Sequence, residues 1–194
     1  MNNSLIFDSL LGDNNIPFIT KWDIPYPYYP VGENFTLPLI TGYNYNFYVD
    51  WGDGSSIEHF IFGIDDNPIA VHAYLSADVY QVSIQGICER FSTTYFGHPP
   101  SESAYLIEIV QWGDISLKLC DSMFDSAVNL VSIPVEDIWT NINDFDRCFY
   151  GCTSLTGNVP ELWLRDPLPS GTDCFYDCTL VDNYVSIPNL WKGL

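Results

Sequence analysis

Short stretches of alternating or continuous apolar residues, each about as long as a β-strand, occupy the first half of the chain. They lie at 35–40, 43–50 and 79–86, and Gly, Asp or Asn bounds each of them. This pattern is typical of half-buried strands. Between two of them, Asp53-Gly54 predicts a hairpin turn, because such a turn needs positive φ and glycine adopts it at little cost. Short strands at this spacing predict a small β-sandwich.

The last third of the chain repeats about every 25 residues. Phe124, Phe149 and Phe175 lie 25 and 26 residues apart. Each is followed by a small residue, a proline and a tryptophan: Ala127, Cys152 and Cys178; Pro134, Pro160 and Pro188; Trp139, Trp163 and Trp191. A fixed period of about 20–30 residues indicates the coils of a solenoid, whose neighbours bury each other's apolar faces. Solenoids usually present a surface to a partner, which favours binding over catalysis.

The sequence therefore predicts a mainly β protein with short helices, made of a β-sandwich and a short solenoid. We expect an N-terminal arm at 1–16, the sandwich at 17–90, a linker at 91–104 and the solenoid at 105–194. Terminal coils of a solenoid normally need a cap. No further sequence follows to cover Leu190, Trp191 and Leu194. We expect this coil to contact another subunit, with the arm as a second tether.

Several short motifs carry a resemblance to known families. The run 50–55, Asp-Trp-Gly-Asp-Gly-Ser, is followed by His72-Ala73-Tyr74 and by a Tyr-x-Val-x-Ile strand. This order resembles the PKD-type (polycystic-kidney-disease) β-sandwich. The lead-in 17–22, the link 107–114 and the Phe…Cys-Thr-Ser-Leu…Pro repeats resemble BspA-like leucine-rich-repeat surface proteins. The resemblance covers residues 17–194 and implies surface display and adhesion, usually in bacteria and sometimes in viruses or phages.

Charge narrows the classes of partner. Six Lys and Arg against 25 Asp and Glu give a net charge of −19. Such a chain repels nucleic-acid phosphates and anionic lipid, so neither is expected as a partner. The N-terminus has no basic region and no apolar run of about 18 residues occurs, which predicts neither a signal peptide nor membrane insertion. We expect the virion surface or the extracellular space, reached without a signal peptide.

The Asp/Gly turn has two interpretations. Its neighbourhood offers carboxylate oxygens that calcium could use, from Asp50, Asp53, Asp65 and Asp66. However, Asp-x-x-Asp-Gly is much shorter than a twelve-residue calcium loop, and turn aspartates usually bind their own backbone. We favour a structural turn formed by Asp50, Trp51, Gly52, Asp53 and Gly54, with His72 and Tyr74 packed and hydrogen-bonded beside it.

Four cysteines form two Cys-x-x-x-Cys pairs one repeat apart, Cys148/Cys152 and Cys174/Cys178, whereas Cys88 and Cys120 are isolated. Stacked pairs could bind zinc or form disulfides. The same positions of the first repeat hold Met123 and Ala127, and a position open to Met, Ala or Cys is typical of a tight core, where free Cys packs as a small hydrophobe. We therefore expect the four cysteines of the two pairs to be buried and metal-free.

Aromatic residues supply the candidate binding surface. Trp112, Trp139, Trp163 and Trp191 recur about once per coil. An exposed ladder of this kind would stack against sugar rings, whereas a buried one would be a core spine, which we favour. Tyr26-Pro27-Tyr28-Tyr29-Pro30 is either a second binding surface or a stiff loop packed on the sandwich. The candidate binding residues are Tyr26, Tyr28, Tyr29, Trp139, Trp163 and Trp191.

Catalytic motifs are absent from the sequence. It contains no Gly-x-Ser-x-Gly, His-Glu-x-x-His, P-loop or Gly-x-Gly-x-x-Gly, and His59, His72 and His98 have no recognisable catalytic spacing. We expect no catalytic residue, no cofactor and no enzymatic activity.

The expected function is that of a structural or attachment protein on the exterior of a virion, and we expect that virion to be a phage. The alternatives are a secreted or surface-bound bacterial adhesin, and an intracellular scaffold. The expected partners are subunits of a larger assembly and a surface glycan.

Overall fold

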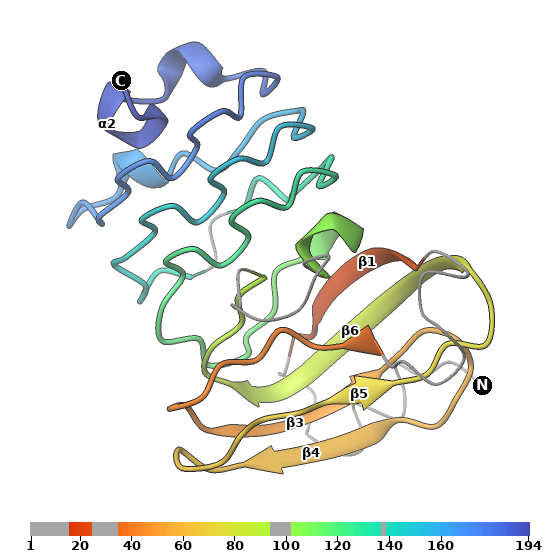
Figure 1. Cartoon of the computed structure of the whole chain (residues 1–194). Coiled ribbons are helices and arrows are strands. Elements are labelled where there is room, and N and C mark those ends of the chain that lie inside the picture. The colour runs from red at the N-terminus through yellow and green to blue at the C-terminus, as the bar shows by residue number, and fades with distance from the viewer. Residues whose placement is uncertain (1–15, 25–34, 94–101, 137–138) are drawn as a thin grey trace.

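The computed structural model describes residues 16–24, 35–93, 102–136 and 139–194. Within these ranges the protein is mainly β, with two antiparallel sheets and a few short helices, as the sequence predicts (Figure 1). The larger sheet has the order β4 (Glu58–Phe62), β3 (Tyr45–Asp50), β6 (Asp78–Cys88), β1 (Phe18–Ile24) and β7 (Leu106–Gln111). The smaller sheet pairs β2 (Phe35–Thr36) with β5 (Val71–His72). The helical turns are η1 (Glu102–Tyr105), η2 (Leu162–Leu164), η3 (Tyr184–Ser186) and α2 (Asn189–Lys192).

Alternation of side chains explains why the two sheets pack face to face. In β3 the buried residues are Tyr45, Phe47 and Val49, and the residues between them are more exposed. Successive strand residues point to opposite faces, so one face of the large sheet is apolar. Trp22 of β1 meets Phe35 of β2 edge to face, with ring centroids 5.0 Å apart. This aromatic contact joins the two sheets, as expected of a small β-sandwich.

The Asp53-Gly54 hairpin is confirmed. Strands β3 and β4 pair antiparallel, and residues 51–57 connect them. Gly54 has φ +83°. Gly52, which lies outside the predicted Asp53-Gly54 turn, has φ +79°. The connection is thus longer than a tight hairpin turn and uses two glycines in the left-handed region, where other residues are strained.

Strand β7 belongs to the sheet and to the repeats at once. It pairs antiparallel with β1 and forms the edge of the large sheet, although it lies within the range 105–194 expected for the C-terminal module. On its other side, Glu108 bridges Ser132 in parallel, and the Ile109 amide donates to the Ser132 carbonyl at 3.0 Å. The first repeat is therefore built directly on the edge of the sandwich. Residues 91–93 of the expected linker are buried, and 94–101 lie outside the described residues.

Successive repeats stack through an aromatic column and through backbone hydrogen bonds. Phe124 stacks on Phe149 at 5.3 Å, and Phe149 stacks on Phe175 at 5.4 Å with an interplanar angle of 5°. The Phe124 amide donates to the Cys148 carbonyl at 2.8 Å, and the Phe149 amide to the Cys174 carbonyl at 2.9 Å. Each repeat also places two residues at positive φ in equivalent positions: Ser122, Arg147 and Asp173, and then Ser126, Gly151 and Asp177. The period seen in the sequence is therefore a period of the backbone itself.

The C-terminal end of the stack differs from the expectation of an uncovered apolar face. Helix α2 folds back over the last repeat, and Trp191 lies over Phe175 with ring centroids 6.4 Å apart. Trp191 is only 3% exposed, so the expectation that it lies uncovered is wrong. Leu190 and Leu194 are exposed, as expected. Gly171 makes this packing possible, because a Cβ there would lie 2.2 Å from the Trp191 ring.

All six cysteines lie within the described residues, where they are buried and unpaired. The expected burial of Cys148, Cys152, Cys174 and Cys178 is confirmed. The Cys152 thiol donates to the Phe124 carbonyl at 3.2 Å, and the Cys178 thiol donates to the Phe149 carbonyl at 3.0 Å. The second cysteine of each pair therefore links its repeat to the one before it. In the described part of the chain, no helix has the length and apolar character needed to cross a membrane.

Replacing the two turn glycines should separate backbone strain from steric clash. We expect Gly54→Ala to cost about 1 kcal/mol of unfolding free energy, because φ +83° is strained for alanine and no atom lies within 4 Å of the new Cβ. Gly52→Ala should cost about 3 kcal/mol or more, because its Cβ would also lie 2.3 Å from the Gln81 carbonyl oxygen. Urea unfolding measures both, and equal costs would contradict this account.

Removing one inter-repeat thiol should be tolerated. We expect Cys152→Ala to cost about 1–2 kcal/mol, because it removes a small buried group and one hydrogen bond without leaving a large cavity. Thermal unfolding of the wild type should be unchanged by a zinc chelator. About one zinc per chain on metal analysis, or a lower melting temperature with chelator, would contradict a purely packing role for these cysteines.

Candidate functional site

The aspartates around the predicted turn bind backbone amides. Asp50 accepts from the Gly52 amide at 3.0 Å, and Asp53 accepts from the Ser55 amide at 2.9 Å. Asp66 accepts from the Gly63 amide at 2.6 Å. Within the described residues, no group of three or more His, Cys, Asp or Glu side chains could hold a metal ion. Each of these three carboxylates therefore binds a backbone amide close to it in sequence, as turn aspartates usually do.

His72 and Tyr74 pack against the turn, as expected. The His72 ring stacks on Trp51, with centroids 4.9 Å apart and an interplanar angle of 12°, and its Nε2 lies 2.8 Å from an Asp53 carboxylate oxygen. The Tyr74 hydroxyl donates to the Trp51 carbonyl at 2.9 Å. Burial raises the pKa of Tyr74 well above its usual range, so this hydroxyl remains a donor. The cluster fixes the β3–β4 connection to the smaller sheet.

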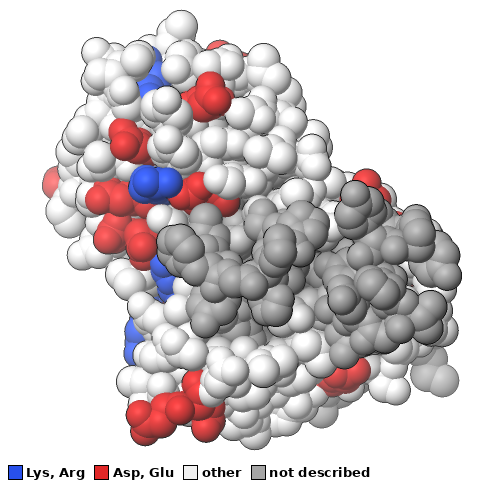
Figure 2. Space-filling view, in the orientation of Figure 1, with Lys and Arg blue, Asp and Glu red and all other residues white. Residues whose placement is uncertain are grey.

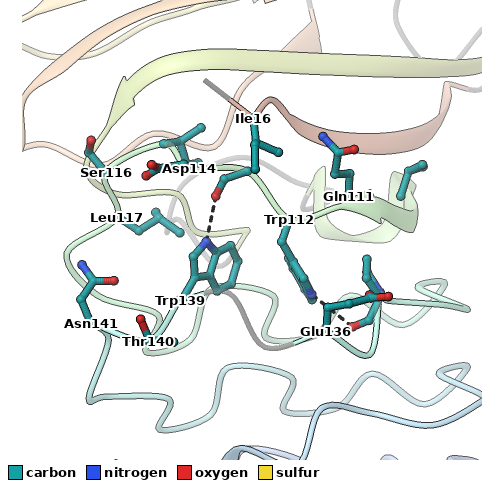
Figure 3. Close-up of a pocket in the computed structure, with 14 residues that line it drawn as sticks. Ile16, Gln111, Trp112, Asp114, Ser116, Leu117, Glu136, Trp139, Thr140 and Asn141 are labelled. Carbon is teal, nitrogen blue, oxygen red and sulfur yellow. Dashed lines mark hydrogen bonds between the residues drawn. The ribbon is translucent and has the colours of Figure 1, made fainter. Parts of the chain in front are cut away.

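A cavity of ligand size lies where β7 leaves the sandwich and meets the first repeat (Figure 3). Its volume is about 730 Å³, within the range of small-molecule sites. Two indoles form its aromatic wall and polar side chains surround them. The lining residues are Ile16, Val110, Gln111, Trp112, Gly113, Asp114, Ile115, Ser116, Leu117, Pro134, Glu136, Trp139, Thr140 and Asn141. We call this cavity the tryptophan groove.

The two indoles of the groove are locked in place by reciprocal hydrogen bonds. Trp112 donates its Nε1–H to the Pro134 carbonyl at 3.1 Å, and Trp139 donates its own to the Gly113 carbonyl at 3.0 Å. The ring centroids are 4.6 Å apart and the planes cross at 55°. Trp112 is buried and Trp139 is half-buried. Because both N–H groups are already used, the rings offer a ligand their carbon surface and π-electrons only.

The polar rim of the groove is rich in hydrogen-bond acceptors. Asp114 and Glu136 are exposed carboxylates on the two sides of the indoles in the view of Figure 3. The Gln111 amide nitrogen donates to the Pro17 carbonyl at 2.8 Å, which directs this donor away from a ligand. Ser116, Thr140 and Asn141 are exposed and offer both donors and acceptors. No Lys or Arg is among the described lining residues.

The other sequence-predicted binding residues lie elsewhere. Trp163 is half-buried and packs edge to face on Phe175 and on Trp191, at 6.2 and 6.1 Å. Arg165 donates to the Trp139 carbonyl at 3.0 Å. The four tryptophans thus pack as two pairs, Trp112/Trp139 and Trp163/Trp191, at two levels of the stack. Tyr26, Tyr28 and Tyr29 lie outside the described residues, as do residues 1–15 of the arm expected at 1–16. The sequence does not predict the acidic rim, because Asp114 and Glu136 are far apart in the chain and come to the same cavity only in the fold.

No protein-family model, curated protein or solved structure matches this chain. The resemblance to PKD-type and BspA-like proteins therefore depends on the short motifs of the sequence.

The Asp53–His72 contact should make stability depend on pH. Burial alone raises the pKa of Asp53, but hydrogen bonds from Ser55 and His72 outweigh it and lower the pKa from 3.8 to about 2. A carboxyl with a depressed folded-state pKa stabilises the fold above its unfolded pKa and loses that contribution as the pH falls. We expect the stability difference between wild type and Asp53→Asn to be largest above about pH 4 and to shrink towards pH 2.

Urea unfolding at several pH values between 2 and 7 measures this difference. Asp65→Asn, at an exposed position of another loop, is the matched control and should leave the pH profile unchanged. A wild-type advantage over Asp53→Asn that stays constant down to pH 2 would contradict the assignment.

Proposed function

We propose that this chain is a non-enzymatic attachment protein that binds a saccharide in the tryptophan groove. The observation that carries the proposal is the pairing of Trp112 with Trp139 under a rim of exposed oxygen acceptors. The apolar C–H face of a sugar ring packs on an aromatic surface, while its hydroxyl groups donate to carboxylate and amide oxygens. The groove offers both kinds of contact within one cavity.

Rigidity supports the proposal. Each indole is hydrogen-bonded to a backbone carbonyl of the neighbouring segment, and Trp139 also packs 6.4 Å from Phe18 of the sandwich core. Binding to a groove held in this way costs little conformational entropy in the protein. A preformed aromatic surface of this kind suits recognition of a rigid ring.

The absence of an activated nucleophile among the described groups favours binding over catalysis. Burial raises the pKa of Cys88 and Cys120, and of Cys148, Cys152 and Cys174, well above the usual range of a thiol. A buried protonated thiol is a poor nucleophile. The aspartates of the turn are engaged with backbone amides, so they are poorly placed as acid–base pairs.

We also propose a family for each of the two parts of the chain. We assign the N-terminal part to PKD-like sandwiches, supported by the position of the Asp53-Gly54 turn and of His72 and Tyr74 beside it. We assign the C-terminal part to BspA-like leucine-rich-repeat solenoids, supported by the stacked phenylalanines and the bonds between repeats. In this proposal the groove lies at the junction of the sandwich and the solenoid, and both contribute to its walls.

The setting that we propose is the exterior of a virion, with a secreted or surface-bound bacterial adhesin as the second candidate. Exposed Leu190 in helix α2 and exposed Leu194 after it favour a contact with another subunit of an assembly. Neighbouring capsid and tail genes would support the first setting, and secretion genes would support the second. Light scattering tests the assembly, and a monodisperse monomer would contradict it.

Removing the half-buried indole of Trp139 should weaken saccharide binding. A glycan array identifies the saccharide, and calorimetry then compares variants. We expect Trp139→Ala to weaken binding by about 30-fold or more, equivalent to about 2 kcal/mol, because it removes the aromatic surface. Trp163→Ala is the matched control, since it truncates a half-buried tryptophan outside the groove. It should lose stability but retain affinity.

A second variant keeps the test independent of core packing. Asn141→Trp adds bulk at an exposed position of the groove wall and leaves both indoles intact. It should block binding without lowering the melting temperature. If no saccharide on the array binds the wild type, or if Asn141→Trp binds as well as the wild type, the proposed groove is wrong.

A further inference from the structure

The basic residues of this protein are all engaged within the chain. Its six Lys and Arg all lie in the described ranges. Four form ion pairs with carboxylates, at 2.7 to 2.8 Å: Lys21 with Glu108, Arg90 with Asp121, Lys118 with Glu89, and Arg147 with Asp125. Lys192 lies over the Tyr184 ring and donates to the Tyr184 carbonyl. Most of the Asp and Glu in the described ranges therefore form no ion pair with the Lys and Arg of the chain.

Arg165 lies near the groove, and it too is occupied. It lines a small adjoining cavity with Glu136 and Trp139. Its guanidinium packs over the Phe145 ring, and Nη1 donates to the Trp139 and Ile142 carbonyls at 3.0 Å. These contacts direct it at backbone oxygens of the repeat. Neither Asp114 nor Glu136 has an ion pair within the described residues.

The tryptophan groove therefore combines two uncompensated carboxylates with two indole surfaces whose N–H groups are already used. An anionic sugar would meet carboxylates without any basic group to balance its charge. A protonated amine gains from both kinds of wall, because it pairs with a carboxylate and is attracted to the face of an indole. Figure 2 shows the same excess of Asp and Glu over Lys and Arg on the visible face of the repeats, so the wider field also attracts cations.

We propose that the saccharide bound in the groove carries protonated amino groups. This inference depends on the proposed saccharide-binding function and specifies its ligand. An oligosaccharide with an amine on each ring pairs with Asp114 and Glu136 on either side of the indoles, while its ring faces pack on Trp139. Neutral sugars lack the charged contact, and uronic, sialic or sulfated sugars are repelled.

Calorimetry with four tetramers tests the proposal. The probes are a β-1,4-linked glucosamine tetramer, its fully N-acetylated form, a galacturonate tetramer and tetralysine. We expect the glucosamine tetramer to bind about tenfold tighter than the acetylated one at low salt, because acetylation removes the charge and keeps the ring. The preference should shrink as salt rises, since ions screen exposed charges. The galacturonate tetramer should not bind.

Charge variants locate the effect. The double variant Asp114→Asn and Glu136→Gln should lose the preference for the amine, while Asp65→Asn, which removes a distant exposed carboxylate, should retain it. The melting temperatures of the variants establish that each remains folded. A preference that survives in the double variant would overturn the proposal.

The remaining outcomes separate this inference from the proposed function. If the acetylated tetramer binds as tightly as glucosamine and Trp139→Ala abolishes both, the saccharide site stands and the amine inference is overturned. If tetralysine binds as tightly as the glucosamine tetramer, the groove recognises cations without regard to sugar rings, and the inference is overturned. If no tetramer binds and the glycan array is also blank, the saccharide-binding function itself fails.

Discussion

The rest of this structure depends on the stacking of Phe124, Phe149 and Phe175 through the repeats. A single repeat has almost no regular secondary structure, and its backbone groups find partners both in short turns of the same repeat and in the next repeat. The rings lie 5.3 and 5.4 Å apart, and that spacing holds the chains close enough for hydrogen bonds of 2.8 to 2.9 Å. The stacking of the phenylalanine rings and the backbone hydrogen bonds between repeats therefore depend on the same spacing of the repeats.

Both ends of the aromatic column are closed by other parts of the chain. At one end Phe91 and Phe18 of the sandwich lie 6.3 and 6.5 Å from Phe124, and at the other end Trp191 covers Phe175. Sandwich and repeats consequently share one hydrophobic core. The repeats also cover β7, which would otherwise be an exposed sheet edge. The tryptophan groove is a product of this junction, since its walls come from both sides of it.

Local and periodic features could be predicted from the sequence, whereas contacts between distant segments could not. The period of the phenylalanines, the burial of the cysteines and the positive φ of Gly54 follow from spacing or from one residue type. Strand β4 has no clear alternation of apolar and polar residues, because the exposed Ile61 lies between the half-buried Phe60 and Phe62. The burial of Trp191 depends on the missing side chain of Gly171, twenty residues earlier. The groove depends on Trp139 reaching Gly113, which no local pattern encodes.

The distribution of charge links this fold to its proposed role. A core built from aromatic rings needs no ion pairs, and the few cations of the chain stabilise loops and repeat edges instead, as Arg147 does by pairing with Asp125 and packing on Tyr150. The remaining carboxylates make the surface acidic, and the aromatic core does not depend on them. At the junction, the carboxylates of Asp114 and Glu136 and the indoles of Trp112 and Trp139 line one cavity. An acidic surface repels most polyanions, so an aromatic cavity within it selects ligands by ring face and by positive or neutral charge.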